Sequence, residues 1–173
     1  MPETEKGLVQ IYTGEGKGKT TAALGLALRA VGQDKRVGFI QFLKNEKCGE
    51  HFFTDRFQIF KIVQMTSEDC FKASPEKLAE EARKTLTFAE EAMLSGKYDL
   101  LILDEIFIAV QKKAINVKQV LKLLDKKPEN LELVLTGRYA PQEIIQRADL
   151  VTEMRLIKHP MARGITARRG IEY

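Results

Sequence analysis

Short apolar runs alternate with amphipathic segments along the chain, and this pattern predicts alternating strands and helices. The apolar runs are bounded by turn residues and predict strands at residues 7–13, 36–43, 57–65, 98–105, 131–137 and 150–154. Between them, apolar residues that continue or recur at spacings of three and four predict helices at residues 20–33, 74–96, 117–124 and 141–147. The polar segment 44–56 predicts an irregular connection.

Two of the predicted helices have recognisable boundaries. The segment 20–33 is apolar almost all round, so we expect a largely buried helix that ends near Gly32. Ser74 followed by Pro75 is typical of an N-cap and a first helical position. The helix that they begin should end near Gly96, a common residue after the last helical turn.

Strands without strong alternation, separated by helices, are typical of a parallel sheet that is covered on both faces. We therefore expect a single α/β domain over residues 1–173, with a doubly wound, mainly parallel sheet and helices on both faces. A basic, irregular tail should follow over residues 155–173.

Four polar residues end predicted strands: Thr13, Asp104, Glu105 and Thr136. Ligands of such sheets lie at the carboxyl ends of the strands. We therefore expect these side chains to share one edge of the sheet.

Composition narrows the classes of protein. The chain is 44% hydrophobic and 30% charged, as in an ordinary globular domain, and no apolar run approaches the roughly 18–20 residues of a membrane span. The first residues lack the apolar core of a signal peptide, so we expect a cytoplasmic protein without a membrane partner. A net charge of +4 suits anionic ligands but is too small to indicate nucleic acid. Cys48, Cys70 and His51 form no convincing disulfide framework or metal set.

The stretch TGEGKGKT, residues 13–20, joins the first predicted strand to the first predicted helix and matches most of the phosphate-loop pattern G-x-x-x-x-G-K-[ST]. Thr13 stands where the pattern has its first glycine. Glycines allow backbone N–H groups to converge on phosphate oxygens at the positive end of the helix. Lys19 adds a cation and the Thr20 hydroxyl can bind Mg²⁺, which a plain glycine turn would not require.

The strand LLILDE ends in Asp104 and Glu105, and a carboxylate in that place can hold Mg²⁺ directly or through water. Together with the phosphate loop, it predicts a nucleoside triphosphate with Mg²⁺ as the ligand. The two motifs leave the reaction open, since Glu105 could also position a water for hydrolysis.

Longer stretches resemble one family, the ATP:corrinoid (cob(I)alamin) adenosyltransferases of the bacterial cobalamin pathway, which have a RecA-like phosphate-loop NTPase fold. The resemblance covers residues 7–173 and is carried by TGEGKGKTTAALGLALRAVG, VGFIQFLK, LILDEI and LVLTGRYAPQEIIQRADLVTEMRLIKHPMARGITARRGIEY. It implies attack of corrinoid Co(I) on the 5′-carbon of ATP, which forms adenosylcobalamin and releases inorganic triphosphate. It implies as partners ATP, cobalamin or another corrinoid, and an electron donor that supplies Co(I); we also expect a homodimer.

The resemblance also implies roles for individual residues. Lys19, Thr20 and Glu105 would be catalytic, and Thr20, Asp104 and Glu105 would form the Mg²⁺ site. The nucleotide and corrinoid contacts would come from Gly14, Glu15, Gly16, Lys17, Gly18, Lys19, Thr20, Thr21, Arg138 and Phe71.

One region departs from the family. Where the family commonly has GFTW after its third strand, this chain has SEDCFKAS and no tryptophan at all. Phe71 is the aromatic residue of that stretch and the candidate for contact with the lower face of the corrin. Two alternatives stay open at this point: a phosphate-loop kinase or ATPase that yields ADP, and a non-catalytic, ATP-dependent corrinoid-binding module.

Overall fold

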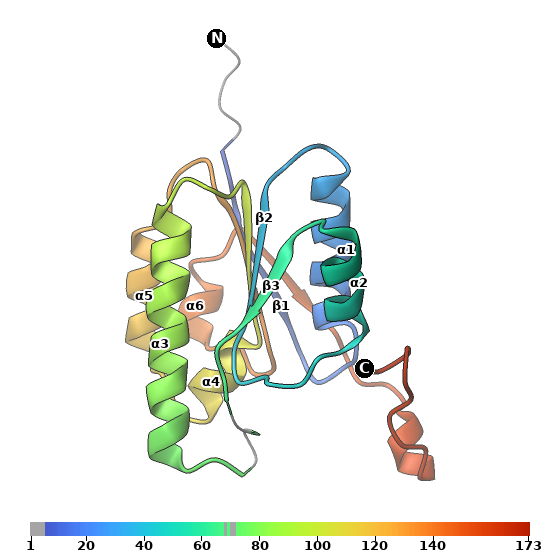
Figure 1. Ribbon diagram of the computed structural model, residues 1–173. Coiled ribbons are helices and arrows are strands. Elements are labelled where there is room, and N and C mark those ends of the chain that lie inside the picture. The colour runs from blue at the N-terminus through green and yellow to red at the C-terminus, as the bar shows by residue number, and fades with distance from the viewer. Residues whose placement is uncertain (1–5, 68, 70–71) are drawn as a thin grey trace.

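The computed structural model describes residues 6–67, 69 and 72–173, and its centre is a six-stranded sheet (Figure 1). The strands are β1 (Val9–Thr13), β2 (Val37–Gln41), β3 (Lys61–Gln64), β4 (Leu100–Asp104), β5 (Glu132–Thr136) and β6 (Leu150–Glu153). Their order is β3-β2-β4-β5-β1-β6, and every neighbouring pair is parallel. The predicted doubly wound parallel sheet is confirmed.

Helices cover both faces of the sheet (Figure 1). One face carries α1 (Lys19–Val31) and α2 (Gly49–Phe57), and the other carries α3 (Pro75–Leu94), α4 (Ile106–Gln111), α5 (Val117–Asp125) and α6 (Gln142–Ile145). After β6 the chain leaves the sheet and forms a short 3₁₀ helix, η1 (Pro160–Arg163). No helix in the described part of the chain is long and apolar enough to cross a membrane.

The central strands are buried on both sides, as a sheet between two helical layers requires. All five residues of β2 and of β4 are buried, whereas the edge strand β6 is exposed throughout. Successive side chains of a strand point to opposite faces, and they divide into two apolar clusters. Phe39 and Ile102 pack beside α1, and Ile40 and Leu103 pack in the larger cluster with α3 to α6.

Helix α1 corrects one prediction. It was expected to be largely buried, but only Lys19, Ala23 and Ala27 are, and Leu28 is 58% exposed. The helix packs one face on the sheet, through small residues such as Ala23 and Ala27, and exposes the other. Its apolar composition alone therefore did not predict how much of the helix is buried.

Helix α2 corrects another, because it lies in the segment 44–56 that was expected to be irregular. Its N-cap is Cys48, which is not among the usual capping residues. Its phenylalanines Phe52, Phe53 and Phe57 are exposed, so the helix has no apolar face of the usual kind. Strand β3 is correspondingly shorter than predicted, since Phe57 ends the helix.

Of two further helices, one was missed by the sequence pattern and one begins where it was predicted. Helix α4 directly follows β4 and was not predicted, because its six residues continue the apolar run of the strand. Helix α3 begins after Ser74, whose hydroxyl accepts a hydrogen bond from the N–H of Lys77, as the Ser-Pro signal predicted.

Candidate functional site

The phosphate loop between β1 and α1 needs its glycines for two reasons. Gly14 and Gly18 have φ values of 98° and 123°, a region that favours glycine. The loop also packs against the backbone of Met154: the N–H of Gly16 donates to its carbonyl at 2.7 Å, and a Cβ at Gly14 or Gly16 would lie 2.5 or 2.6 Å from that oxygen. Met154, the residue after β6, therefore supports the loop.

Thr13, the departure from the phosphate-loop pattern, has a structural role. Its side chain is buried, and its hydroxyl accepts a hydrogen bond from the N–H of Ala140 at 3.1 Å. It ties the start of the loop to the segment between β5 and α6. A glycine at this position would leave that N–H without the threonine oxygen.

Lys19 lies inside the loop. Its ammonium donates to the carbonyl oxygens of Gly14 at 2.7 Å and Gly16 at 2.8 Å, and the residue is buried. Burial lowers the pKa of Lys19, and Glu105 opposes this shift. The ammonium of Lys19 thus lies within the phosphate loop, at the positive end of α1.

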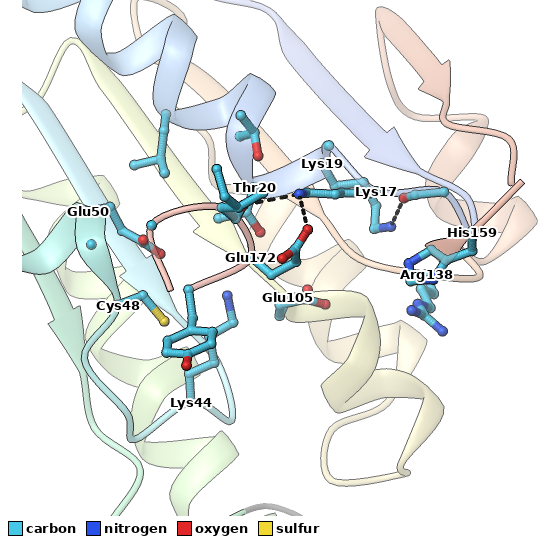
Figure 2. Close-up of a pocket in the computed structure, with 18 of the residues that line it drawn as sticks. Lys17, Lys19, Thr20, Lys44, Cys48, Glu50, Glu105, Arg138, His159 and Glu172 are labelled. Carbon is cyan, nitrogen blue, oxygen red and sulfur yellow. Dashed lines mark hydrogen bonds and ion pairs between the residues drawn. The ribbon is translucent and has the colours of Figure 1, made fainter. Parts of the chain in front are cut away.

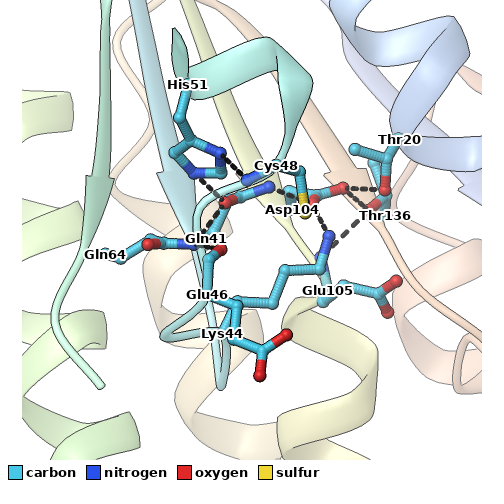
Figure 3. A network of polar contacts seen from close by, with 10 residues as sticks. All are labelled: Thr20, Gln41, Lys44, Glu46, Cys48, His51, Gln64, Asp104, Glu105 and Thr136. Atoms are coloured by element: carbon cyan, nitrogen blue, oxygen red, sulfur yellow. Dashed lines mark hydrogen bonds and ion pairs between the residues drawn. The ribbon is translucent and has the colours of Figure 1, made fainter. Parts of the chain in front are cut away.

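Asp104, at the end of β4, is fully buried and accepts hydrogen bonds from four side chains (Figure 3). The hydroxyls of Thr20 and Thr136 donate to Oδ1 at 2.9 and 2.7 Å. Gln41 and Lys44 donate to Oδ2 at 3.1 and 3.2 Å. Donors from α1, β2, β5 and the segment after β2 satisfy this buried carboxylate, and they confirm that the strand ends share one edge.

Glu105 differs sharply from its neighbour. It has a left-handed φ of 60° at the N-terminus of α4, where its N–H donates to the Thr136 hydroxyl at 3.0 Å. Among the described residues, its buried Oε2 has no hydrogen-bond partner. Burial, followed by the charge of Asp104, raises the pKa of Glu105. A buried carboxylate oxygen without a partner, on a residue that lines the same pocket as Thr20, fits the oxygen ligands that Mg²⁺ prefers.

A second layer of polar contacts behind Asp104 was not predicted (Figure 3). The N–H of Cys48 donates to Nδ1 of His51 at 3.0 Å, so Nε2 carries the proton and donates to Oε1 of Gln41 at 2.9 Å. Gln64 also donates to that oxygen, at 3.0 Å. Because Oε1 of Gln41 already accepts two hydrogen bonds, the atom of this amide that faces Asp104 must be the NH₂ group, which donates.

The side chains of Cys48, Glu50 and His51 have possible metal ligands within 4.8 Å of one another. Both ring nitrogens of His51 are already engaged, and burial lowers its pKa, which favours the neutral ring. Burial also raises the pKa of the Cys48 thiol, which favours its protonated form. Cys48 and His51 thus form the cap of α2, and the His51 ring also supports Gln41.

The loop, the acidic strand end and the tail surround one pocket of about 590 Å³, a volume suited to a nucleotide (Figure 2). Most of the predicted site residues line it: Glu15, Gly16, Lys17, Gly18, Lys19, Thr20, Thr21, Glu105 and Arg138. Gly14 and Asp104 lie behind the lining and hold it through Lys19 and Thr20. Phe71 lies outside the described residues.

Sequence reasoning missed several lining residues: Leu24, Lys44, Cys48, Gly49, Glu50, His159, Gly170, Ile171, Glu172 and Tyr173. Lys44 follows the end of β2, the strand beside β4, so the rule that ligands lie at strand ends could have found it. The tail residues carry no comparable signal.

The tail reaches the phosphate loop through Glu172 (Figure 2). The ammonium of Lys17 lies 3.0 Å from both Oε1 of Glu172 and the carbonyl oxygen of Ile171. Hydrogen bonds from Arg168, with Lys17, lower the pKa of Glu172 to about 2. A carboxylate of the tail thus pairs with a lysine of the phosphate loop.

Comparisons with known proteins match almost the whole chain to one family. A family model described as ATP:corrinoid adenosyltransferase BtuR/CobO/CobP matches residues 5–173. A corrinoid adenosyltransferase of Sinorhizobium sp is 37% identical, over 98% of this chain and 81% of its own length. The corrinoid adenosyltransferase of Escherichia coli K12 is 32% identical, over 99% of this chain and 88% of its own.

Proposed function

This chain belongs to the ATP:corrinoid adenosyltransferase family, and from that premise we propose that it transfers the 5′-deoxyadenosyl group of ATP to Co(I) of a corrinoid, with release of inorganic triphosphate. The observation that carries the proposal is the family match, which runs through the loop, the acidic strand end and the tail around the pocket. Membership makes the chain a transferase, which sets aside the kinase or ATPase and the non-catalytic module.

The electron balance of the reaction explains what the residues must do. Co(I) of the corrinoid supplies both electrons of the new bond to the 5′-carbon and becomes Co(III), while the bond from that carbon to the α-phosphate oxygen breaks and its electrons leave with triphosphate. Because Co(I) is already a strong nucleophile, no side-chain nucleophile is needed. The protein has to hold the two reactants in line and stabilise the leaving anion.

The phosphate loop supports the binding of that anion. Backbone N–H groups of the loop, Lys17, Lys19 and Arg138 would contact the triphosphate, since all of them belong to the pocket wall. To do so, Lys19 exchanges the carbonyl oxygens of Gly14 and Gly16 for phosphate oxygens. Lys17 likewise leaves Glu172.

Mg²⁺ is part of the proposal. The hydroxyl of Thr20 and the carboxylate of Glu105 would hold it, with Asp104 in support through its hydrogen bond to Thr20. The buried Oε2 of Glu105, which lacks a partner among the described residues, supports this assignment. When bound, the ion offsets negative charge on the triphosphate oxygens.

The remaining parts concern partners. We propose that Phe71, in the region that departs from the family, contacts the lower face of the corrin, and that a separate electron donor supplies Co(I). A homodimer is supported by the exposed phenylalanines Phe52, Phe53 and Phe57 of α2, because monomers rarely expose neighbouring aromatic side chains without use. A cytoplasmic location would give the enzyme access to its ATP.

The test is anaerobic incubation of the protein with ATP, Mg²⁺ and chemically reduced cobalamin. We expect the absorption spectrum of adenosylcobalamin to appear, with one inorganic triphosphate released per turnover by ³¹P NMR. Stoichiometric ADP without an adenosylated corrinoid would refute the proposal.

A further inference from the structure

Lys44 occupies a place in the site that none of the predicted roles covers. It follows β2 after a turn in which the buried Leu43 has a left-handed φ of 53°. The ammonium lies 3.2 Å from Oδ2 of Asp104 and forms an ion pair with it (Figure 3). The side chain is 32% exposed and lines the nucleotide pocket, so one side chain borders both the buried carboxylate and the pocket.

Asp104 does not depend on Lys44 for its hydrogen bonds. Thr20, Thr136 and Gln41 donate to its two oxygens in addition to the lysine. Removing the ammonium therefore leaves no buried carboxylate oxygen without a donor. What Lys44 adds is a positive charge beside Asp104 and Glu105.

A divalent cation at Thr20 and Glu105 would make that charge unfavourable, because two cations would then share the same pair of carboxylates. Lysine is a point charge on a flexible four-carbon stem, so its ammonium can move while the stem stays in place. Lys44 lines the pocket in which the triphosphate would bind. Triphosphate carries the largest negative charge that the proposed reaction brings to this pocket.

We propose that Lys44 exchanges partners during the reaction cycle: it pairs with Asp104 in the free protein and with the triphosphate once the metal and ATP are bound. This inference rests on the proposed function for the identity of the anion. It makes Lys44 a fourth cation of the triphosphate site, beside Lys17, Lys19 and Arg138. It also makes Lys44 a competitor of the metal when no anion is present.

Two binding measurements with opposite expected signs test the exchange. In Lys44→Met, Mn²⁺ alone, measured by its EPR signal, should bind roughly three- to twentyfold more tightly, the effect of removing a unit charge about 5 Å from a divalent ion in water. Inorganic triphosphate with Mg²⁺, measured by calorimetry, should bind about tenfold more weakly, because one charge-assisted hydrogen bond is lost.

The matched control is Lys47→Met. Lys47 lies three residues away in the same segment, but its ammonium is exposed and pairs with Asp55 at 2.8 Å. This variant loses the same charge and should bind Mn²⁺ and triphosphate as the wild type does. Lys44→Arg keeps the charge and should retain triphosphate binding within a few-fold.

Weaker Mn²⁺ binding in Lys44→Met would overturn the exchange, since a structural loss weakens both ligands together. Unchanged triphosphate binding would overturn it too, because Lys44 would then serve Asp104 alone. Both measurements omit the corrinoid. If the wild type made no adenosylcorrinoid, the proposed function would fail while these results would still decide the role of Lys44.

Discussion

The fixed direction of the Gln41 amide allows a sharp prediction for the variant Gln41→Glu. The two hydrogen bonds that Gln41 Oε1 accepts from His51 and Gln64 require its other atom to be a donor toward Asp104, 3.1 Å away. A carboxylate in its place can meet Asp104 only by taking up a proton, since two ionised carboxylates at this distance repel one another. The protonated acid would then reproduce the hydrogen bond of the amide.

The size of the effect follows from the distances. Two unit charges about 3–4 Å apart interact with about 4–5 kcal/mol at an effective dielectric constant of about 20. Lys44, at 3.2 Å from the same oxygen of Asp104, offsets roughly half of this repulsion. The remaining 2–3 kcal/mol or so raises the pKa of the introduced acid by about two units above the ordinary value of about 4.3.

The sign follows from proton binding. Between the unfolded pKa near 4.3 and the raised folded pKa, the folded state holds more protons, so stability falls as the pH rises. The difference in unfolding free energy between variant and wild type, from urea titrations, should grow by about 2–3 kcal/mol from pH 4.5 to pH 7 and then level off. A difference that is flat with pH would refute the assigned direction of the Gln41 amide.

Four other variants test three residues of the site and Phe71. Lys19→Ala should lose about 2–4 kcal/mol of transition-state stabilisation, measured as kcat/KM for ATP in the folded variant; an unchanged value would contradict its role. Glu172→Gln should free Lys17 and lower KM for ATP about two- to fivefold, whereas a higher KM would mean that the contact assists binding. Because burial lowers the pKa of His51, the unfolded chain takes up this proton first, and stability is lost as the pH falls below about 6.5; the Tm of His51→Gln should fall less than that of the wild type between pH 7 and 5.5, and an equal fall would exclude His51. Phe71→Ala should impair turnover most when reduction starts from Co(II) on the enzyme, with ATP affinity unchanged by calorimetry; equal losses from Co(II) and Co(I) would remove Phe71 from the corrin site.

The parts of the site that the sequence predicted are those fixed by local geometry. A glycine loop between a strand and a helix has few backbone solutions, and Asp104 and Thr136 lie at one edge because parallel strands end there. The parts that it missed depend on long-range packing. Helix α2 is capped by Cys48 and His51, and the His51 ring also donates to Gln41, so no usual capping pattern predicted this helix. Glu172 reaches Lys17 across more than 150 residues, and no spacing encodes such a contact.

Three lysines of the site have hydrogen-bond partners within the chain, and this affects how tightly the metal and the triphosphate bind. Lys19 is held by loop carbonyls, Lys17 by Glu172 and Lys44 by Asp104, so a triphosphate that arrives alone must replace an existing partner for each of them. Among the described residues, Oε2 of Glu105 is buried without a partner, so a cation there gains a ligand without breaking a hydrogen bond. A metal bound at Glu105 would also weaken the hold of Asp104 on Lys44 by competing for the same charge. Triphosphate should therefore bind more tightly with its metal than the charge of the metal alone would explain, because the ion helps to release the lysine that the anion then uses.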